Sequence, residues 1–143
     1  MADIEATGPI DWFLLEFPSK EITGALVPPL LDLVDRRLIR ILDALVIMKD
    51  GDGYEALTSS DLEARGLVTL GPLAGASSGI LTDDDAAQAA AALGPDAAGL
   101  ILVYENLWAA PFAVAARKAG GQLVADGRIH VQDMIARLDE LGA

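Results

Sequence analysis

Four short runs of apolar, β-branched and aromatic residues predict the strands of this chain. The runs occupy residues 11–17 (DWFLLEF), 38–49 (LIRILDALVIMK), 98–105 (AGLILVYE) and 122–129 (QLVADGRI). In the second and third runs, apolar residues stand at consecutive positions instead of alternate ones. This pattern is typical of a strand that is covered on both faces, whereas a strand with one face in water alternates apolar and polar residues.

Apolar residues at spacings of three and four, together with capping residues, predict the helices. The expected helices cover residues 28–37, 59–65, 83–93, 107–119 and 130–141. Thr82 can cap the third of them, and Asp85 holds the reciprocal position of a capping box. The last helix is amphipathic, and its apolar face consists of Val131, Met134, Ile135, Leu138 and Leu141.

The order of these elements predicts an α+β domain of the ferredoxin-like kind, a doubled βαβ with a four-stranded antiparallel sheet. Both crossover helices are expected on one face of the sheet, because such crossovers are right-handed. An irregular helical and glycine-rich insertion at residues 54–97 separates the two halves, and a C-terminal helix follows. At 143 residues, a single domain over residues 1–143 is expected.

A flavodoxin-like parallel sheet is the alternative fold. Such a fold requires a glycine-rich phosphate turn after its first strand, and the segment Pro18-Ser19-Lys20 stands at that place. The doubled βαβ is therefore the favoured fold.

Charge and composition argue against several partners and compartments. The formal net charge of -12 opposes binding to nucleic acid and to anionic membranes, since both are negative. The sequence has no cysteine, so it holds no disulfide, thiol nucleophile or thiolate metal site. The first five residues lack the pattern of a signal peptide, and residues 66–82 are too polar and glycine-rich for a membrane span. A cytoplasmic protein is expected.

Each candidate for metal binding or catalysis also has a structural interpretation. The run Asp83-Asp84-Asp85 could ligate Mg²⁺ or Ca²⁺, but a charged helix N-terminus explains all three carboxylates. Glu16 and Glu105 hold matching places in the two βαβ units, yet antiparallel neighbouring strands would put them at opposite ends of the sheet. No metal and no cofactor are predicted.

The sole histidine, His130, is the other candidate ligand contact beside Glu105. Its place at the start of the last helix is also an ordinary surface position. The sequence holds no recognisable catalytic set, and whether the chain is an enzyme stays open.

Four blocks of the sequence carry a resemblance to a known family. They are WFLLEFP, IRILDALVIMKDGDG, LTDDDAAQAAAALGPDAAGLILVYENLWA and AGGQLVADGRI. Over roughly residues 10–130 the chain resembles a small family that is common in actinobacteria and is known only as a domain of unknown function. That family is similar to bacterial predicted membrane proteins with a glycine zipper, and Gly71, Gly75 and Gly79 keep the four-residue spacing. The resemblance implies no known activity, cofactor or catalytic residue.

The mean hydropathy of +0.39 indicates more apolar side chains than one small domain can bury. The leading hypothesis is therefore a non-enzymatic domain that self-associates as a homodimer or larger oligomer. The residues expected at the contact are Trp12, Trp108, Leu102 and Val103. Tryptophan is enriched at interface hot spots, although both tryptophans could equally be anchors of the core. The two aliphatic residues lie on a strand that needs cover. Two alternatives stay open: a small-molecule binder or enzyme of the dimeric ferredoxin-like type, and a peripheral membrane protein that uses residues 66–82.

Overall fold

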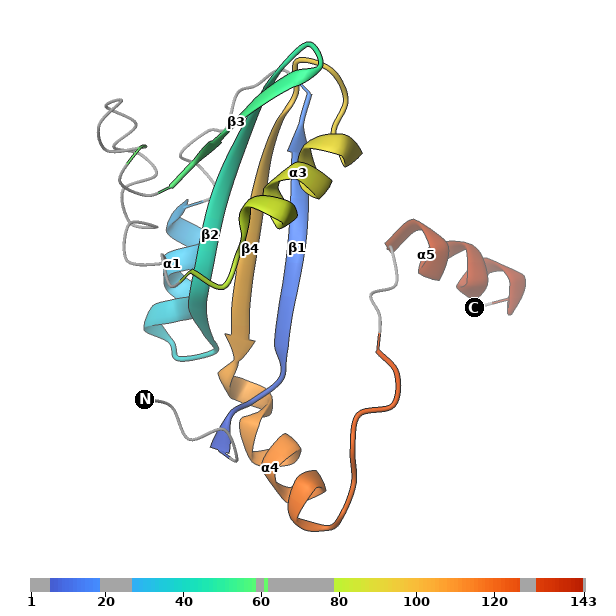
Figure 1. The fold of residues 1–143 in the computed structure, drawn as a ribbon. Helices are drawn as coiled ribbons and strands as arrows, with labels where there is room; N and C mark the ends of the chain where they lie inside the picture. The colour runs from blue at the N-terminus through green and yellow to red at the C-terminus, as the bar shows by residue number, and fades with distance from the viewer. Residues whose placement is uncertain (1–5, 19–26, 59–60, 62–78, 127–130, 143) are drawn as a thin grey trace.

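The computed structural model describes residues 6–18, 27–58, 61, 79–126 and 131–142 of the chain (Figure 1). Its strands are β1 (Ile10–Phe17), β2 (Ile39–Asp50), β3 (Gly53–Leu57) and β4 (Ala98–Asn106). Its helices are α1 (Val27–Asp35), α3 (Asp83–Ala92), the short 3-10 helix η4 (Leu107–Ala109), α4 (Ala110–Lys118) and α5 (Val131–Glu140). The expected α+β class and the four-stranded antiparallel sheet are confirmed.

The strands lie in the order β1-β4-β2-β3, and each neighbouring pair is antiparallel. β4 therefore lies between β1 and β2 in the sheet, and the connection from β1 to β2 carries α1. In the same way β2 stands between β3 and β4, and the connection between those two strands carries α3. Two interlocked βαβ units build the sheet, with β2 and β4 at its centre and β1 and β3 at its edges.

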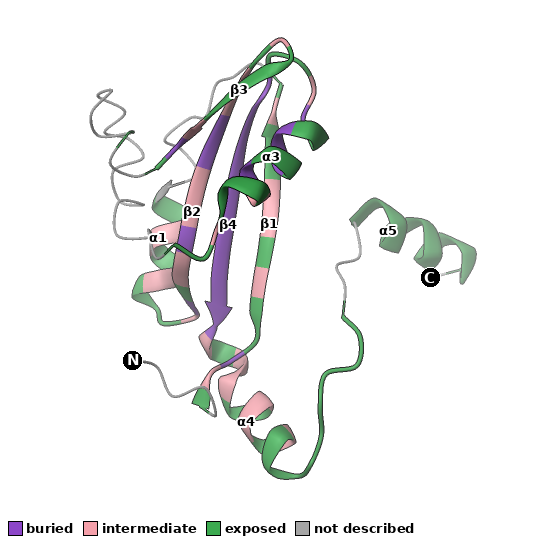
Figure 2. Ribbon diagram, viewed as in Figure 1, coloured by how far each residue is buried: buried purple, intermediate pink, exposed green. Residues whose placement is uncertain are grey.

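The two central strands are covered on both faces, each face by its own helix (Figure 1). Leu102 and Tyr104 of β4 pack in a cluster with Leu30 and Val34 of α1. Ile101 points the opposite way, toward the alanines of α3. Every residue of β4 is buried as a result (Figure 2).

The sequence predicts crossover helices at residues 28–37 and 107–119, both on one face. The first is present as α1, but the second is not a crossover, because no strand follows α4 within residues 119–126. The second crossover is instead α3, which lies on the face opposite α1. The physical reason is the consecutive apolar residues of β2 and β4, which leave both faces of the sheet in need of cover. The helix inside the expected insertion, α3, supplies the second cover.

The fourth strand comes from a segment that the apolar pattern does not single out. After the turn at residues 50–53, β3 returns along β2, and its Leu57 pairs with Val46 and is buried. The strand expected at residues 122–129 is wrong over its described part, since residues 122–126 form neither helix nor strand and are exposed. A tight hairpin brings β3 beside β2 at a small loop-closure cost, so residues 53–57 take the edge position.

The N-terminus of α3 forms the capping box expected from the sequence. The Thr82 hydroxyl accepts a hydrogen bond from the Asp85 amide at 3.2 Å, and the Asp85 carboxylate accepts one from the Thr82 amide at 2.8 Å. The Asp84 carboxylate accepts a hydrogen bond from the Gln88 side chain at 2.8 Å. These contacts, together with the helix dipole, give the acidic run a structural role.

Replacing Thr82 with alanine is expected to lower the free energy of unfolding by about 1 kcal/mol, because α3 loses its side-chain cap. The double replacement Asp83→Asn with Asp84→Asn is expected to cost about 1 kcal/mol or less, through weaker interaction with the helix dipole. Urea denaturation followed by circular dichroism measures both changes. A divalent ion that binds at micromolar concentration and is lost in the double variant would contradict the structural role.

Candidate interaction groove

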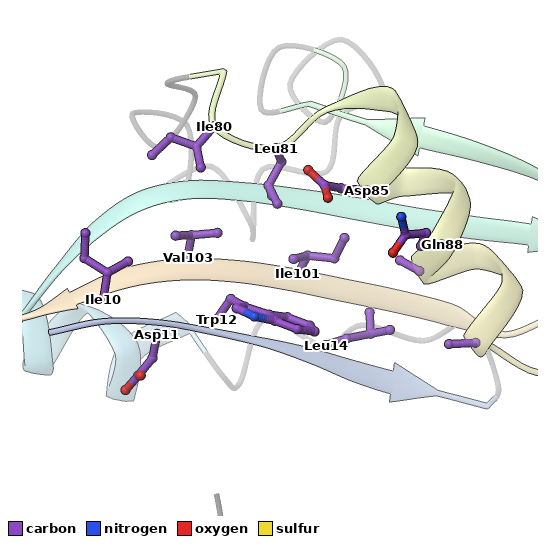
Figure 3. Close-up of a pocket in the computed structure, with 12 residues that line it drawn as sticks. Ile10, Asp11, Trp12, Leu14, Ile80, Leu81, Asp85, Gln88, Ile101 and Val103 are labelled. Atoms are coloured by element: carbon purple, nitrogen blue, oxygen red, sulfur yellow. The ribbon is translucent and has the colours of Figure 1, made fainter. Parts of the chain in front are cut away.

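A groove opens on the α3 side of the sheet, beside the edge strand β1 (Figure 3). Its volume is about 380 Å³, and its lining comes from β1, β4, α3 and the residues just before α3. We call it the α3 groove. The large apolar side chains that line it are Ile10, Trp12, Leu14, Ile80, Leu81, Ile101 and Val103.

Helix α3 covers one end of this face and leaves the other end open. The strand register places Leu14 beside Ile101 and Trp12 beside Val103 on the same face. The alanines of α3 pack against the first of these pairs, while Trp12 is 69% exposed and Ile80 is 51% exposed. Contiguous exposed apolar surface of this kind marks an interaction or ligand site. The open end of the α3 groove is therefore the candidate site.

A buried carboxylate holds the segment before α3 against the groove. Asp43 of β2 is 5% exposed, and it accepts hydrogen bonds from the Leu81 amide at 2.8 Å and from the Ala44 amide at 2.9 Å. It lies where the register between β2 and β4 shifts. The bond to Leu81 positions the neighbouring Ile80 at the rim. The only signal of this contact in the sequence is that Asp43 interrupts an apolar run.

The polar side chains that line the groove have partners within the chain. Asp85 belongs to the capping box of α3. Gln88 donates a hydrogen bond to Asp84, and Asp11 accepts one from the Asn106 side-chain amide at 2.9 Å. The groove therefore offers mainly apolar contacts to a partner.

The four residues expected at an interaction surface fall in three places. Trp12 and Val103 line the α3 groove. Leu102 is 1% exposed and faces α1, so the chain itself covers it. Trp108 of η4 is 66% exposed, and its indole Nε1 donates to the Asn106 side-chain oxygen at 3.3 Å; it is not among the residues that line the groove.

Glu16 and Glu105 lie at opposite ends of the β1–β4 pair, as expected from the antiparallel arrangement. Glu105 is buried and accepts hydrogen bonds from the Gly8 amide at 2.9 Å and from the Arg40 guanidinium at 2.5 Å. Glu16 accepts one from the Gly94 amide at 2.8 Å. Each carboxylate thus has a structural contact, and the two do not share a site.

Some of the residues singled out in the sequence lie outside the part of the chain that the structure describes. His130 and residues 66–78 of the glycine-rich stretch lie outside the described residues. Within the described ranges, no three His, Cys, Asp or Glu side chains form a group able to hold a metal ion. In that same part of the chain, no helix combines the length and the apolar character needed to cross a membrane.

Helix α5 presents an apolar face that no other described segment of the chain buries. The one-sided pattern expected from the sequence is present in a helix, and all of its residues are exposed (Figure 2). Val131 is 69% exposed and Ile135 is 54% exposed. An amphipathic helix gains its stability mainly by packing its apolar face, and no residue of α5 is buried.

The sheet, its two covering helices and the α3 groove define a small α+β domain with an apolar surface site. The chain belongs to the family described as "Family of unknown function (DUF6325)", whose pattern matches residues 6–143. This match confirms the expected membership of a family without an assigned function. No curated protein and no solved structure matches the chain.

Proposed function

We propose that this chain is a protein-interaction domain that self-associates, and that the α3 groove is its contact surface. The observation that carries the proposal is Trp12, a residue that is 69% exposed within an apolar groove. Tryptophan is among the residues most enriched at interface hot spots. A partner that covered Trp12, Ile10 and Ile80 would remove the largest exposed apolar side chains of this face from water.

The side chains around the groove favour binding of a partner through apolar contacts over catalysis. Its charged and amide side chains are engaged with residues of the same chain. Glu105, expected from the sequence as a ligand contact, accepts hydrogen bonds from the Gly8 amide and the Arg40 guanidinium. Binding in the groove would thus be driven by burial of apolar surface, at about 25 cal/mol per Å².

The two tryptophans provide a matched test, because they are almost equally exposed and only Trp12 lines the groove. Trp12→Thr is expected to weaken self-association by at least about tenfold, since hot-spot truncations cost about 2 kcal/mol or more. Trp108→Thr is expected to leave the dissociation constant within about twofold. Sedimentation equilibrium measures both constants. Equal losses in the two variants, or a loss only in Trp108→Thr, would contradict the assignment of the groove.

A small apolar molecule is the second candidate partner, and the groove volume favours it. Ligand pockets usually span about 300–1,000 Å³, and the groove of about 380 Å³ lies within that range. Titration with the neutral fluorophore N-phenyl-1-naphthylamine tests this candidate. A saturable signal that Trp12→Thr removes, in a protein that stays monomeric, would favour ligand binding over self-association.

A further inference from the structure

We infer that the outer edge of β1 pairs with β1 of a second copy of this chain, so that two four-stranded sheets join into one sheet of eight strands. This inference rests on the proposed self-association and names the backbone contact that performs it. In the sheet, β1 has β4 on one side and no described strand on the other (Figure 1). A strand added at this edge extends the sheet beside the open end of the α3 groove.

The hydrogen bonds to β4 leave alternate residues of β1 with backbone groups that point to the outer edge. Pro9 continues the register of the β1–β4 pair and lies opposite Asn106, whose amide donates to the Pro9 carbonyl at 2.7 Å. Opposite residues of an antiparallel pair alternate between hydrogen-bonded and non-hydrogen-bonded, so the odd-numbered residues of β1 bond to β4. The even-numbered residues direct their N–H and C=O groups outward, where no backbone group of the described residues bonds to them. These residues are Ile10, Trp12, Leu14 and Glu16.

β1 lacks the features with which edge strands resist pairing. Protected edges are short, carry lysine or proline, or contain a β-bulge. β1 has eight residues, IDWFLLEF, without lysine, proline or glycine, and its register with β4 runs without a shift. The opposite edge strand, β3, has only five residues. β1 is therefore the edge that is suited to take a further strand.

A two-fold axis at Phe13 matches every outward-pointing residue of β1 with one of the second copy. In that antiparallel register, Trp12 lies opposite Leu14 of the second copy, and Ile10 lies opposite its Glu16, each as a hydrogen-bonded pair. Moving the axis by one residue in either direction leaves Ile10 or Glu16 without a partner in the opposite strand. The register centred on Phe13 therefore forms the most hydrogen bonds.

The same register joins the two grooves and keeps like charges apart. Trp12 and Leu14 both line the α3 groove (Figure 3), so the exposed Trp12 of each copy lies against Leu14 of the other. Because the alanines of α3 pack against Leu14, the covered end of one groove lies beside the open end of the other. On the α1 face, Asp11 lies opposite Leu15 of the second copy and about 13 Å from its Asp11. At about 0.15 M salt, repulsion is screened beyond about 8 Å.

Hydrogen exchange of the unmodified protein tests the pairing residue by residue. In one chain alone, the amides of Trp12 and Leu14 point to water, whereas the amides of Phe13 and Leu15 bond to β4. As the protein concentration rises, exchange at Trp12 and Leu14 is expected to slow about tenfold or more, while exchange at Phe13 and Leu15 changes little. A contact made by groove side chains alone would not produce this alternation.

Engineered disulfides test the register, since the chain has no native cysteine. Asp11→Cys and Leu15→Cys are made in separate proteins that differ in mass through a tag, and the two are mixed and oxidised. The two positions form a non-hydrogen-bonded pair across the axis, with Cα atoms about 4.5 Å apart, which a disulfide can span. A mixed-mass disulfide is expected. Each protein alone is the matched control, because two copies of the same cysteine lie about 13 Å apart; a yield several-fold lower is expected from it.

These measurements separate the edge pairing from the proposed function. If Trp12→Thr weakens a dimer in which the amides of Trp12 and Leu14 still exchange fast, edge pairing is wrong while the groove contact stands. If those amides are protected and the mixed disulfide is absent, the edge is supported and the register centred on Phe13 is wrong. A monomer at every concentration overturns both proposals.

Discussion

Leu102→Lys is expected to unfold the chain, with a loss of about 4 kcal/mol or more in the free energy of unfolding. Leu102 is 1% exposed in the centre of β4, packed with Tyr104 and Ile39 beneath α1. A lysine there would bury an unpaired charge, one of the few changes that cost this much. Circular dichroism at 25 °C and a thermal melt measure the loss.

Val103→Lys is the matched comparison, one position along the same strand. Val103 is 6% exposed and lies in the α3 groove on the opposite face, and a lysine stem can extend through the open end of the groove and carry its charge out to water. This variant is expected to stay folded and to lose self-association. If the two variants lower the melting temperature equally, Val103 does not open to water through the α3 groove, and the groove is not an open contact surface.

Glu105→Ala is expected to lower the free energy of unfolding by about 2–3 kcal/mol. The replacement leaves the Gly8 amide, which is buried, without its acceptor, and an unsatisfied buried amide costs about 1–3 kcal/mol. It also removes the ion pair with Arg40, whose side chain is half exposed and can turn to water, so that part of the loss is small. Urea denaturation gives the total.

Glu105→Gln is the graded control, since the glutamine carbonyl keeps an acceptor for Gly8, while the charge and the acceptor for Arg40 are lost. We expect a loss of about 1 kcal/mol for this variant. Hydrogen exchange at Gly8 locates the effect, with faster exchange in Glu105→Ala than in Glu105→Gln. A change below about 0.5 kcal/mol in Glu105→Ala would show that the contact does not anchor the N-terminal segment.

Three of the four strands and most described helices follow from local patterns in the sequence. Apolar and branched residues predict β1, β2 and β4 to within a residue or so of each end. The Thr82–Asp85 pair predicts the start of α3, because a capping box uses only contacts within one turn. These elements are predictable since their determinants lie close together in the chain.

β3 is not predictable from its own residues. Its sequence, GYEAL, contains Gly, Glu and Ala, which are depleted in strands. The strand forms because the preceding turn places it against β2, where Leu57 is buried opposite Val46. Residues 122–126 include Leu123 and Val124, yet both are exposed and pair with no strand. Strand formation here depends on a neighbour more than on propensity.

Two residues of the candidate site, Trp12 and Val103, were predictable from the sequence. Ile80, which also lies at the open end, reaches the groove because the Asp43 carboxylate accepts a hydrogen bond from the Leu81 amide across the fold. A contact between residues so far apart in sequence cannot be seen from spacing. The division of Leu102 and Val103 between two faces also requires the position of both helices.

The charge of -12 on each chain opposes self-association, and it makes the expected dimer sensitive to salt. Repulsion between two acidic copies is long-range, and at about 0.15 M salt it is screened beyond about 8 Å. Burial of the apolar groove does not weaken with salt. The dimer should therefore become tighter as the ionic strength rises.

Light scattering coupled to size exclusion tests self-association most directly. One chain has a mass of 14.9 kDa. At high micromolar concentration and at about 0.15 M salt, the account predicts a mass twice that of one chain, and a shift toward one chain's mass on dilution or in Trp12→Thr. A mass of 14.9 kDa at every concentration and salt would contradict it.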